Sequence, residues 1–515
     1  MTELLSNHLG GQWRLGSGAG TPLFDPVLGT ELARVDATGL DLAAGFAFAR
    51  QTGGAALRAM TYQQRAAMLA AAGKVLQAQR DAYYEIATAN SGTVKTDSAV
   101  DIDGGLFTLG TYAKLGGGLG DQRFLLDGEP ARLGKDPLFQ SQHVLLPTRG
   151  VALFINAFNF PSWGLWEKTA PALLAGVPVI IKPATSTAWL TQRMVKDVVD
   201  AGVLPPGALS VICGSAAGLL DQLQPFDVVS FTGSAQTAAL VRAHPAVVQR
   251  SVRVNIEADS VNSALLLPGN APGSEAFELL VKEVAREMTV KSGQKCTAIR
   301  RIFVPQTLYG QVAEAVSARL AKTTVGNPRN AAVRMGALVS RAQLQAVQDG
   351  LAYLQAQTQT LHDGASHSLV DADPAIACCI GPTLLGSSNP DAADRAHDTE
   401  VFGPVATLMP YRDAEHALAL IRRGQGSLVA SVYGSDAAAL ASTALSLADS
   451  HGRVHLVSPD VAALHTGHGN VMPQSLHGGP GRAGGGEELG GLRALNFYHR
   501  RAAVQASTGV LAALG

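Results

Sequence analysis

Cysteine, aromatic residues and charge are all scarce in this sequence. Its 515 residues include four cysteines, 5% aromatic residues and 16% charged residues. Four cysteines in a chain of this length do not make a disulfide framework, and no pair has the C-x2-C spacing of a zinc site. We therefore expect a protein of a reducing, cytoplasmic compartment. Apolar residues make up 47% of the chain, which excludes a disordered polypeptide.

The sequence also lacks an excess of charge and a long apolar run. Lys and Arg number 40 against 41 Asp and Glu, which gives a net charge of -1 and argues against a nucleic-acid partner. The most apolar stretch, 169–181, contains Pro171, Gly176 and Pro178. It is too short for a bilayer, which needs about 20 residues. The N-terminus has no basic region of the kind that opens a signal peptide. We expect no membrane partner.

Strands and helices alternate through most of the chain. Between 150 and 257, apolar runs such as VALFI, VPVIIK and DVVSFT are separated by helical patterns of about 10–15 residues. This alternation predicts a parallel sheet that is covered on both faces. A second alternating region begins near 262, and a Gly-rich segment, 468–490, is expected to form a loop over a site. A Gly-rich and charged stretch, 113–135, is expected to be a loop or linker.

A candidate phosphate site lies in FTGS, 231–234, between a strand and a helix. A helix N-terminus presents free N–H groups and suits a phosphate, although Gly and Ser also serve there as plain turn and cap residues. The G-x-G-x-x-G fingerprint of dinucleotide binding is absent, and CGSAAG, 213–218, matches it only in part.

A candidate nucleophile is Cys296, in the sequence KSGQKCTAIRR. Nearby cations favour the thiolate, and four basic residues are close in sequence: Lys291, Lys295, Arg300 and Arg301. The alternative is a small buried apolar residue, which is how we interpret Cys378 and Cys379.

Two acids and two histidines complete the candidates. Glu257 ends a predicted parallel strand, where ligands bind in open α/β sheets, although it could instead pair with an arginine. Glu400 lies among turn residues. His465 and His468 lack a third ligand, so we expect no metal.

Taken together and in order, these motifs resemble the aldehyde dehydrogenase superfamily. The resemblance rests on NFP (159–161), KPA (182–184), FTGS (231–234), GQKC (293–296) and EVFGP (400–404), with Glu257 at a strand end. It spans about 480 residues. It implies an α/β fold with two doubly wound parallel-sheet domains and a small β oligomerisation arm. The implied domains are 1–129 with 150–257 for the dinucleotide, 258–466 for catalysis, a connecting loop at 467–487, and an arm and tail at 130–149 and 488–515.

The resemblance also implies roles for particular residues. Cys296 would attack an aldehyde, the Asn159 amide and the Cys296 N–H would hold the oxyanion, and Glu257 would activate water to hydrolyse the thioester. Lys168 and Glu488 match family residues that support proton transfer. The implied cofactor-binding residues are Phe158, Lys182, Thr185, Gly214, Gly218, Phe231, Thr232, Gly233, Ser234, Glu400 and Phe402.

Several positions depart from the family pattern. Where the family commonly has Trp-Lys, this chain has Glu167-Lys168, and we expect Glu167 to point toward Cys296 and Glu257 and to assist proton removal. The alternative is an exposed pair. An acid that often contacts the ribose of NAD is replaced by Thr185, next to KPA, so we expect NADP to be preferred over NAD.

The sequences around two motifs, NAFNFPSWGLWEK and IKPAT, are most similar to family members that oxidise 3,4-dehydroadipyl-CoA semialdehyde in benzoate degradation. They are also similar to the dehydrogenase half of bifunctional phenylacetate enzymes. A CoA-linked aldehyde is therefore the implied substrate, and the implied assembly is a homodimer or a dimer of dimers. Three alternatives remain: a CoA-acylating dehydrogenase, a dehydrogenase for a free semialdehyde, and a silent relative. Glu257 argues against the first, and an intact Asn159, Glu257 and Cys296 against the last.

Overall fold

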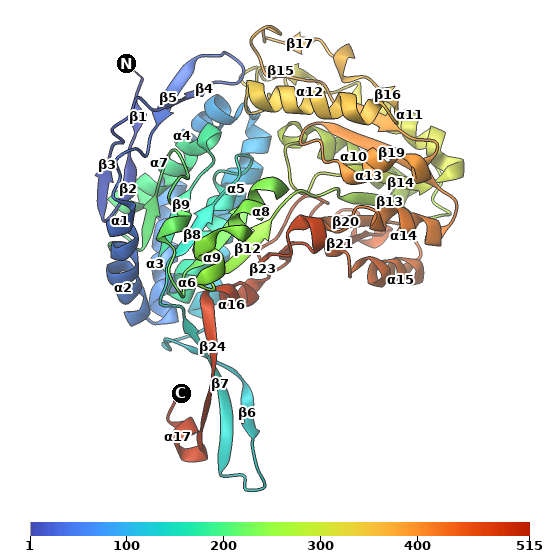
Figure 1. Ribbon diagram of the computed structural model, residues 1–515. Helices are drawn as coiled ribbons and strands as arrows, with labels where there is room; N and C mark the ends of the chain where they lie inside the picture. Colours follow the sequence, from blue (N-terminus) through green and yellow to red (C-terminus); the bar gives the residue numbers. More distant parts are fainter. Residues whose placement is uncertain (1, 515) are drawn as a thin grey trace.

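The structure is a computed structural model that describes residues 2–514. Met1 and Gly515, which belong to the expected segments 1–129 and 488–515, lie outside the described residues. Two sheet-containing halves lie side by side, and a narrow arm projects from one of them (Figure 1). The α/β fold with two doubly wound sheets is confirmed.

The first half is built around a seven-stranded sheet with the order β12-β11-β8-β9-β10-β2-β3. The strands from β12 to β10 are parallel, and β2 and β3 add an antiparallel edge. The bounds are β2 Asn7–Leu9, β3 Gln12–Arg14, β8 Ala152–Ile155, β9 Val179–Lys182, β10 Leu209–Val211, β11 Val228–Thr232 and β12 Arg253–Glu257.

Helices cover both faces of this sheet because successive strand side chains point to opposite sides. Ala152 and Phe154 pack into one core with α3–α7, whereas Leu153 packs into another with α1, α8 and α9. The bounds are α1 Leu42–Phe48, α2 Gly54–Ala59, α3 Tyr62–Ala78, α4 Arg80–Ile86, α5 Lys95–Gly117, α6 Trp163–Ala175, α7 Ala188–Asp200, α8 Ala235–Ala243 and α9 Pro245–Gln249.

The second half has its own seven-stranded sheet, with the order β16-β18-β19-β14-β13-β20-β21. Only β16 is antiparallel to its neighbour. The strands are β13 Ser263–Leu266, β14 Arg301–Pro305, β16 Gln359–His362, β18 Thr383–Gly386, β19 Val405–Tyr411, β20 Ser427–Tyr433 and β21 His451–Val457. The helices are α10 Glu275–Thr289, α11 Tyr309–Leu320, α12 Arg341–Gln355, α13 Asp394–Asp398, α14 Ala414–Arg422 and α15 Ala437–Leu447.

The arm is a three-stranded antiparallel sheet with the order β24-β7-β6. It joins β6 Leu125–Arg132 and β7 Phe139–Pro147 to β24 His499–Ser507, which is followed by α17 Thr508–Ala512. All nine residues of β24 pair with β7. The arm therefore combines segments that are far apart in sequence.

Short strands complete the architecture. A small sheet near the N-terminus contains β1 Leu4–Leu5, β4 Thr21–Phe24 and β5 Glu31–Val35, and β15 Val325–Gly326 pairs with β17 Leu369–Val370. The hairpin of β22 Leu476–Gly478 and β23 Glu487–Leu489 lies in the Gly-rich segment and places His477 opposite Glu488. The short helix α16 Leu495–Tyr498 precedes the arm strand.

The two sheets meet end to end. Strands of the first sheet finish at Lys182, Thr232 and Glu257, whereas Cys296 and Glu400 precede strands β14 and β19 of the second. The carboxyl edge of one sheet therefore faces the amino edge of the other. The chemistry-bearing residues gather where these edges approach each other.

Three details of the sequence interpretation need correction. The stretch 113–135 is not a continuous loop, because α5 extends to Gly117 and β6 begins at Leu125. The boundary expected at 130 therefore falls inside an arm strand. Only part of the expected tail belongs to the arm: Leu489 and Leu495 are buried in the first core. Within 2–514, no helix is both long and apolar enough to cross a membrane.

Candidate active site

The position of Cys296 is fixed by a strained turn. Lys291 and Ser292 have φ values of 53° and 54°, and Gly293 follows with φ 68°. These left-handed values are unfavourable for side chains other than glycine and are common at functional sites. A Cβ on Gly293 would lie 2.2 Å from the carbonyl oxygen of Gly403, so only glycine fits there. The turn and a 2.7 Å hydrogen bond from Asn262 to the Cys296 carbonyl set the direction of the thiol.

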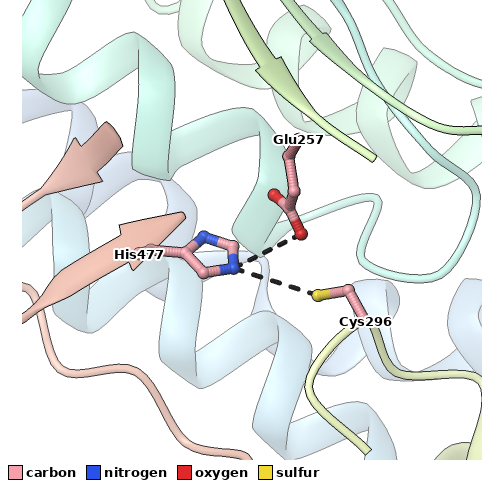
Figure 2. Close-up of side chains that lie close together, drawn as sticks. All are labelled: Glu257, Cys296 and His477. Atoms are coloured by element: carbon pink, nitrogen blue, oxygen red, sulfur yellow. Dashed lines mark hydrogen bonds and ion pairs between the residues drawn. The ribbon is translucent and has the colours of Figure 1, made fainter. Parts of the chain in front are cut away.

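Three side chains converge at this point, as Figure 2 shows. Nε2 of His477, on β22, lies 3.9 Å from Sγ of Cys296 and 3.4 Å from Oε1 of Glu257. Glu257 comes from the end of β12, so the three groups come from three separate parts of the chain. Glu257 and His477 are almost completely buried. The expected proximity of Cys296 and Glu257 is therefore present, together with a histidine that was not expected.

A buried charge cluster extends from this histidine. Nδ1 of His477 lies 3.0 Å from Oε2 of Glu167, whose other oxygen accepts a hydrogen bond of 3.1 Å from Nζ of Lys168. Lys168 also donates to Thr232 at 2.8 Å and pairs with Glu488 at 3.0 Å. Glu167 and Lys168 are only 2% and 1% exposed, so they are not an exposed pair. Glu167 faces the pocket of Cys296 and Glu257 through His477.

Burial and charge compete in setting the protonation of these groups. Burial alone lowers the pKa of His477, but Glu257 and Glu167 outweigh it and raise that pKa well above the ordinary value. Burial alone raises the pKa of Glu257, but His477 and Lys168 reverse the direction and lower it. For Lys168, the carboxylates of Glu167 and Glu488 overcome burial, and the pKa is raised. The cluster therefore holds charges in an interior where isolated charges are unstable.

The expected activation of Cys296 by its sequence neighbours is wrong. Burial, and then the charge of Glu257, raise the pKa of Cys296 to about 12, and His477 opposes this shift. The four basic residues that are close in sequence are bound elsewhere. Lys291 lies over the Phe160 ring, Lys295 pairs with Glu287, Arg300 with Glu400, and Arg301 donates to backbone carbonyls of the second half.

Cys296 lies between two cavities. One, of about 220 Å³, is bounded by α5, Phe160, Trp163 and residues 469–472, and its lining is mostly apolar. The other, of about 670 Å³, runs along the carboxyl edge of the first sheet. Asn159 lines the larger cavity and a small recess beside Glu167, Glu257 and His477. The thiol is therefore accessible from both sides.

Most of the expected cofactor-binding residues line the larger cavity. They are Phe158, Lys182, Thr185, Phe231, Thr232, Gly233, Ser234, Glu400 and Phe402. The Ser234 side chain caps α8, whose N-terminus faces the cavity and suits a phosphate. Phe158 and Phe402 contact each other edge to face at 5.7 Å. Burial raises the pKa of Glu400 to about 7, opposed by Arg300, and its carboxylate accepts a hydrogen bond from the Ser260 N–H. This cavity has the size and donors that a dinucleotide needs.

Two expected cofactor residues, Gly214 and Gly218, do not line this cavity. A Cβ on Gly214 would lie 2.8 Å from the backbone nitrogen of Ala37, so packing against the N-terminal segment accounts for glycine there. Gly218 has φ 78°, which accounts for a second glycine by backbone conformation.

His477 is the functional residue that sequence reasoning missed. It lies 181 residues from Cys296 and 310 residues from Glu167, inside a Gly-rich segment. The two histidines that the sequence offered as candidates lie elsewhere: His465 contacts His455, and His468 contacts Ser431. The available signal was the unusual Glu167, because a buried carboxylate requires a partner. One possible metal-ligand atom from each of four residues lies within 4.8 Å of the others: Glu167, Glu257, His477 and Glu488. Lys168 already neutralises two of these carboxylates, Glu167 and Glu488.

Comparison with known proteins agrees with this geometry. Residues 13–504 match the model of the aldehyde dehydrogenase family. The chain belongs to this family. It is 56% identical, over 92% of its length and 93% of the relative, to 3,4-dehydroadipyl-CoA semialdehyde dehydrogenase of Aromatoleum evansii. It is 45% identical to Protein MaoC of Klebsiella aerogenes, over 35% of this chain and 53% of that protein.

Solved aldehyde dehydrogenases share the fold. Lactaldehyde dehydrogenase from Escherichia coli superposes with a TM-score of 0.85 at 20% identity, covering 98% of this chain and 99% of that one. Succinate-semialdehyde dehydrogenase from Burkholderia pseudomallei gives a TM-score of 0.84 at 24% identity, with 98% of both chains covered. This aldehyde dehydrogenase is therefore an oxidoreductase that acts on an aldehyde and uses NAD or NADP.

Proposed function

We propose that this aldehyde dehydrogenase oxidises a CoA-linked semialdehyde to the free acid, with NADP preferred over NAD. The observation that supports it best is the placement of Cys296 between a narrow apolar cavity and a larger one that suits a dinucleotide. The proposed substrate is 3,4-dehydroadipyl-CoA semialdehyde, formed in benzoate catabolism. It is supported by the relative that is named for this substrate and shares 56% of its residues with this chain.

The residues can divide the reaction into two stages. Cys296 gives up its proton to Glu257 and its sulfur forms a bond to the aldehyde carbon, so that the negative charge moves to the aldehyde oxygen. Asn159 and the Cys296 N–H would stabilise that oxyanion. Lys182, Thr185 and Ser234 would hold the dinucleotide, which when bound would accept the hydride from the substrate carbon and leave a thioester on Cys296.

The second stage is hydrolysis of the cysteine thioester. After Glu257 has passed on the proton that it took from Cys296, it removes a proton from water, and the hydroxide bonds to the acyl carbon. The carbon–sulfur bond then breaks, and Glu257 returns its new proton to the sulfur, which restores the Cys296 thiol. The small recess that Asn159, Glu167, Glu257 and His477 line beside the thiol offers a place for this water. Because Glu257 is present and its pKa is lowered by His477 and Lys168, water rather than CoA is the proposed acyl acceptor.

Two replacements separate the stages. Cys296→Ala should lower kcat by about a thousandfold or more because the nucleophile is gone. Its NADP affinity should change little. Glu257→Gln should slow steady turnover more than the first burst of NADPH. Stopped-flow absorbance and cofactor titration measure both, and near-normal turnover of Cys296→Ala would refute the mechanism.

Cofactor preference can be tested at Thr185. The hydroxyl of Thr185 and the ammonium of Lys182 both line the cavity and can contact a 2′-phosphate, whereas a carboxylate would repel it. Thr185→Glu should shift the ratio of kcat/KM for NADP over NAD by about tenfold or more toward NAD. Thr185→Gln is the uncharged control of similar size. A clear preference for NAD in the unmodified enzyme would contradict the proposal.

Glu167 is proposed to assist proton removal from Glu257. Both oxygens of Glu167 are already engaged, one by His477 and one by Lys168, so its carboxylate links the pocket to the buried cluster. Glu167→Gln should slow thioester hydrolysis by about tenfold while sparing the hydride burst, and should shift the pH profile of turnover. Rapid-quench detection of accumulated acyl-enzyme measures this, and equal loss of both stages would contradict it.

The substrate assignment predicts a preference for a long, CoA-bearing aldehyde. The apolar cavity of about 220 Å³ has room for an acyl chain, so the CoA nucleotide would lie outside it. The enzyme should show at least about tenfold higher kcat/KM for the CoA-linked semialdehyde than for the matched free semialdehyde. Product analysis should find the free carboxylic acid; a new CoA thioester at the oxidised carbon would favour the acylating alternative.

The assembly is proposed to be a homodimer or a dimer of dimers. The arm exposes large apolar side chains at Leu126, Leu138, Phe139 and Leu146. Such a surface on a projecting sheet is typical of contact between subunits. A cytoplasmic location accompanies this proposal.

A further inference from the structure

The general base proposed here, Glu257, is buried with very little support from hydrogen bonds. Its side chain is 3% exposed, and within residues 2–514 its Oε1 atom has no hydrogen-bond partner. The closest cation is His477, whose Nε2 lies 3.4 Å from that oxygen. A buried carboxylate without a cation or donors takes up a proton and becomes neutral. A neutral Glu257 could not remove a proton from water.

Other charged groups near Glu257 are already neutralised. Lys168 is shared between Glu167 and Glu488, and its third donor position is filled by Thr232. Glu488 is further fixed by hydrogen bonds from Ser230 and Asn255. Cys296 contributes no positive charge. Among the described groups that face Glu257, His477 is therefore the cation nearest to it, with Nε2 at 3.4 Å from Glu257 and at 3.9 Å from Sγ of Cys296.

His477 is itself held in the charged form. Its Nδ1 atom faces Glu167 at 3.0 Å, and its ring lies 4.9 Å from the Trp163 ring, so both its charge and its orientation are fixed. The hairpin register places it opposite Glu488 on the neighbouring strand. An imidazole between two carboxylates favours protonation, and the raised pKa of His477 agrees with this.

We propose that His477 is a positioning residue that keeps Glu257 ionised and thereby sets the lower pH limit of thioester hydrolysis. This inference rests on the proposed function, in which Glu257 activates the hydrolytic water. His477 also lines the apolar cavity, and the role proposed here is its effect on the charge of Glu257. Glu167 fixes its Nδ1 atom, and Nε2 supplies the positive charge to Glu257.

The test is the pH dependence of hydrolysis in His477→Gln. Glutamine keeps a side-chain donor of similar reach but carries no charge. Without the cation, the pKa of Glu257 should rise, and the acid limb of the hydrolysis rate should move up by about one pH unit or more. Below the limb, the rate should fall by about tenfold per unit, and it should recover substantially at high pH. Single-turnover decay of the acyl-enzyme, measured by rapid quench, reports this step.

His465→Gln is the matched control. His465 lies in the same half of the chain and contacts His455 rather than Glu257. Its profile should match that of the unmodified enzyme. An unchanged acid limb in His477→Gln, or a uniform loss at every pH, would overturn the inference.

A second measurement does not use His477→Gln. The infrared difference between the unmodified enzyme and Glu257→Gln should show loss of a carboxylate band at pH 7. Loss of a carboxylic-acid C=O band instead would mean that Glu257 is neutral, and would overturn the inference. Failure of the proposed function is distinct, because Glu257→Gln would then hydrolyse the acyl-enzyme at the normal rate.

Discussion

The active site depends on a buried network of alternating charges. An unbroken series of ion-pair contacts, each between 3.0 and 3.4 Å, runs from Glu257 through His477, Glu167 and Lys168 to Glu488. Removing any one member takes an ion pair from each of its neighbours, and the loss of a charged partner is destabilising in a protein interior. Because these residues come from β12, α6 and the β22–β23 hairpin, the network also connects the Gly-rich segment to the first sheet.

The meeting of the two sheets explains why the network lies where it does. Parallel strands direct their carboxyl ends to one edge, so Glu257 and Thr232 reach that edge by the direction of the first sheet alone. Cys296 reaches the same place from the opposite side, because the strained turn before β14 directs it away from its own sheet. The apolar cavity and the larger cavity then meet at the thiol. The proposed nucleophile and the proposed base are thus supplied by different halves of the molecule, and the relative placement of the halves controls their separation.

Local sequence patterns were sufficient for the parallel strands of the first sheet, and the strand-end position of Glu257 predicted its place at an edge. Of the second sheet they indicated only the strands near 263–266 and 301–305, and the family resemblance implied the rest. The electrostatics of Cys296 could not be predicted in the same way. Lys295 is adjacent to Cys296 in sequence, yet its Nζ atom is 2.7 Å from both oxygens of Glu287 and neutralises that residue instead. Nearness along the chain is therefore a poor predictor of which charges pair, because a long side chain such as lysine can turn toward a different buried partner.

Glu167 and His477 together show what the sequence contained but did not reveal. The family commonly has tryptophan where this chain has Glu167, and a carboxylate in that largely apolar helix needs compensation. Lys168 compensates one oxygen, and the other faces His477, from a hairpin more than 300 residues later. The acid and the histidine therefore form one electrostatic unit. Together they place a fixed imidazolium beside Glu257, the proposed base. Such a cation changes the proposed base, and His477 also lines the apolar cavity together with residues of α5 and of the segment 469–472.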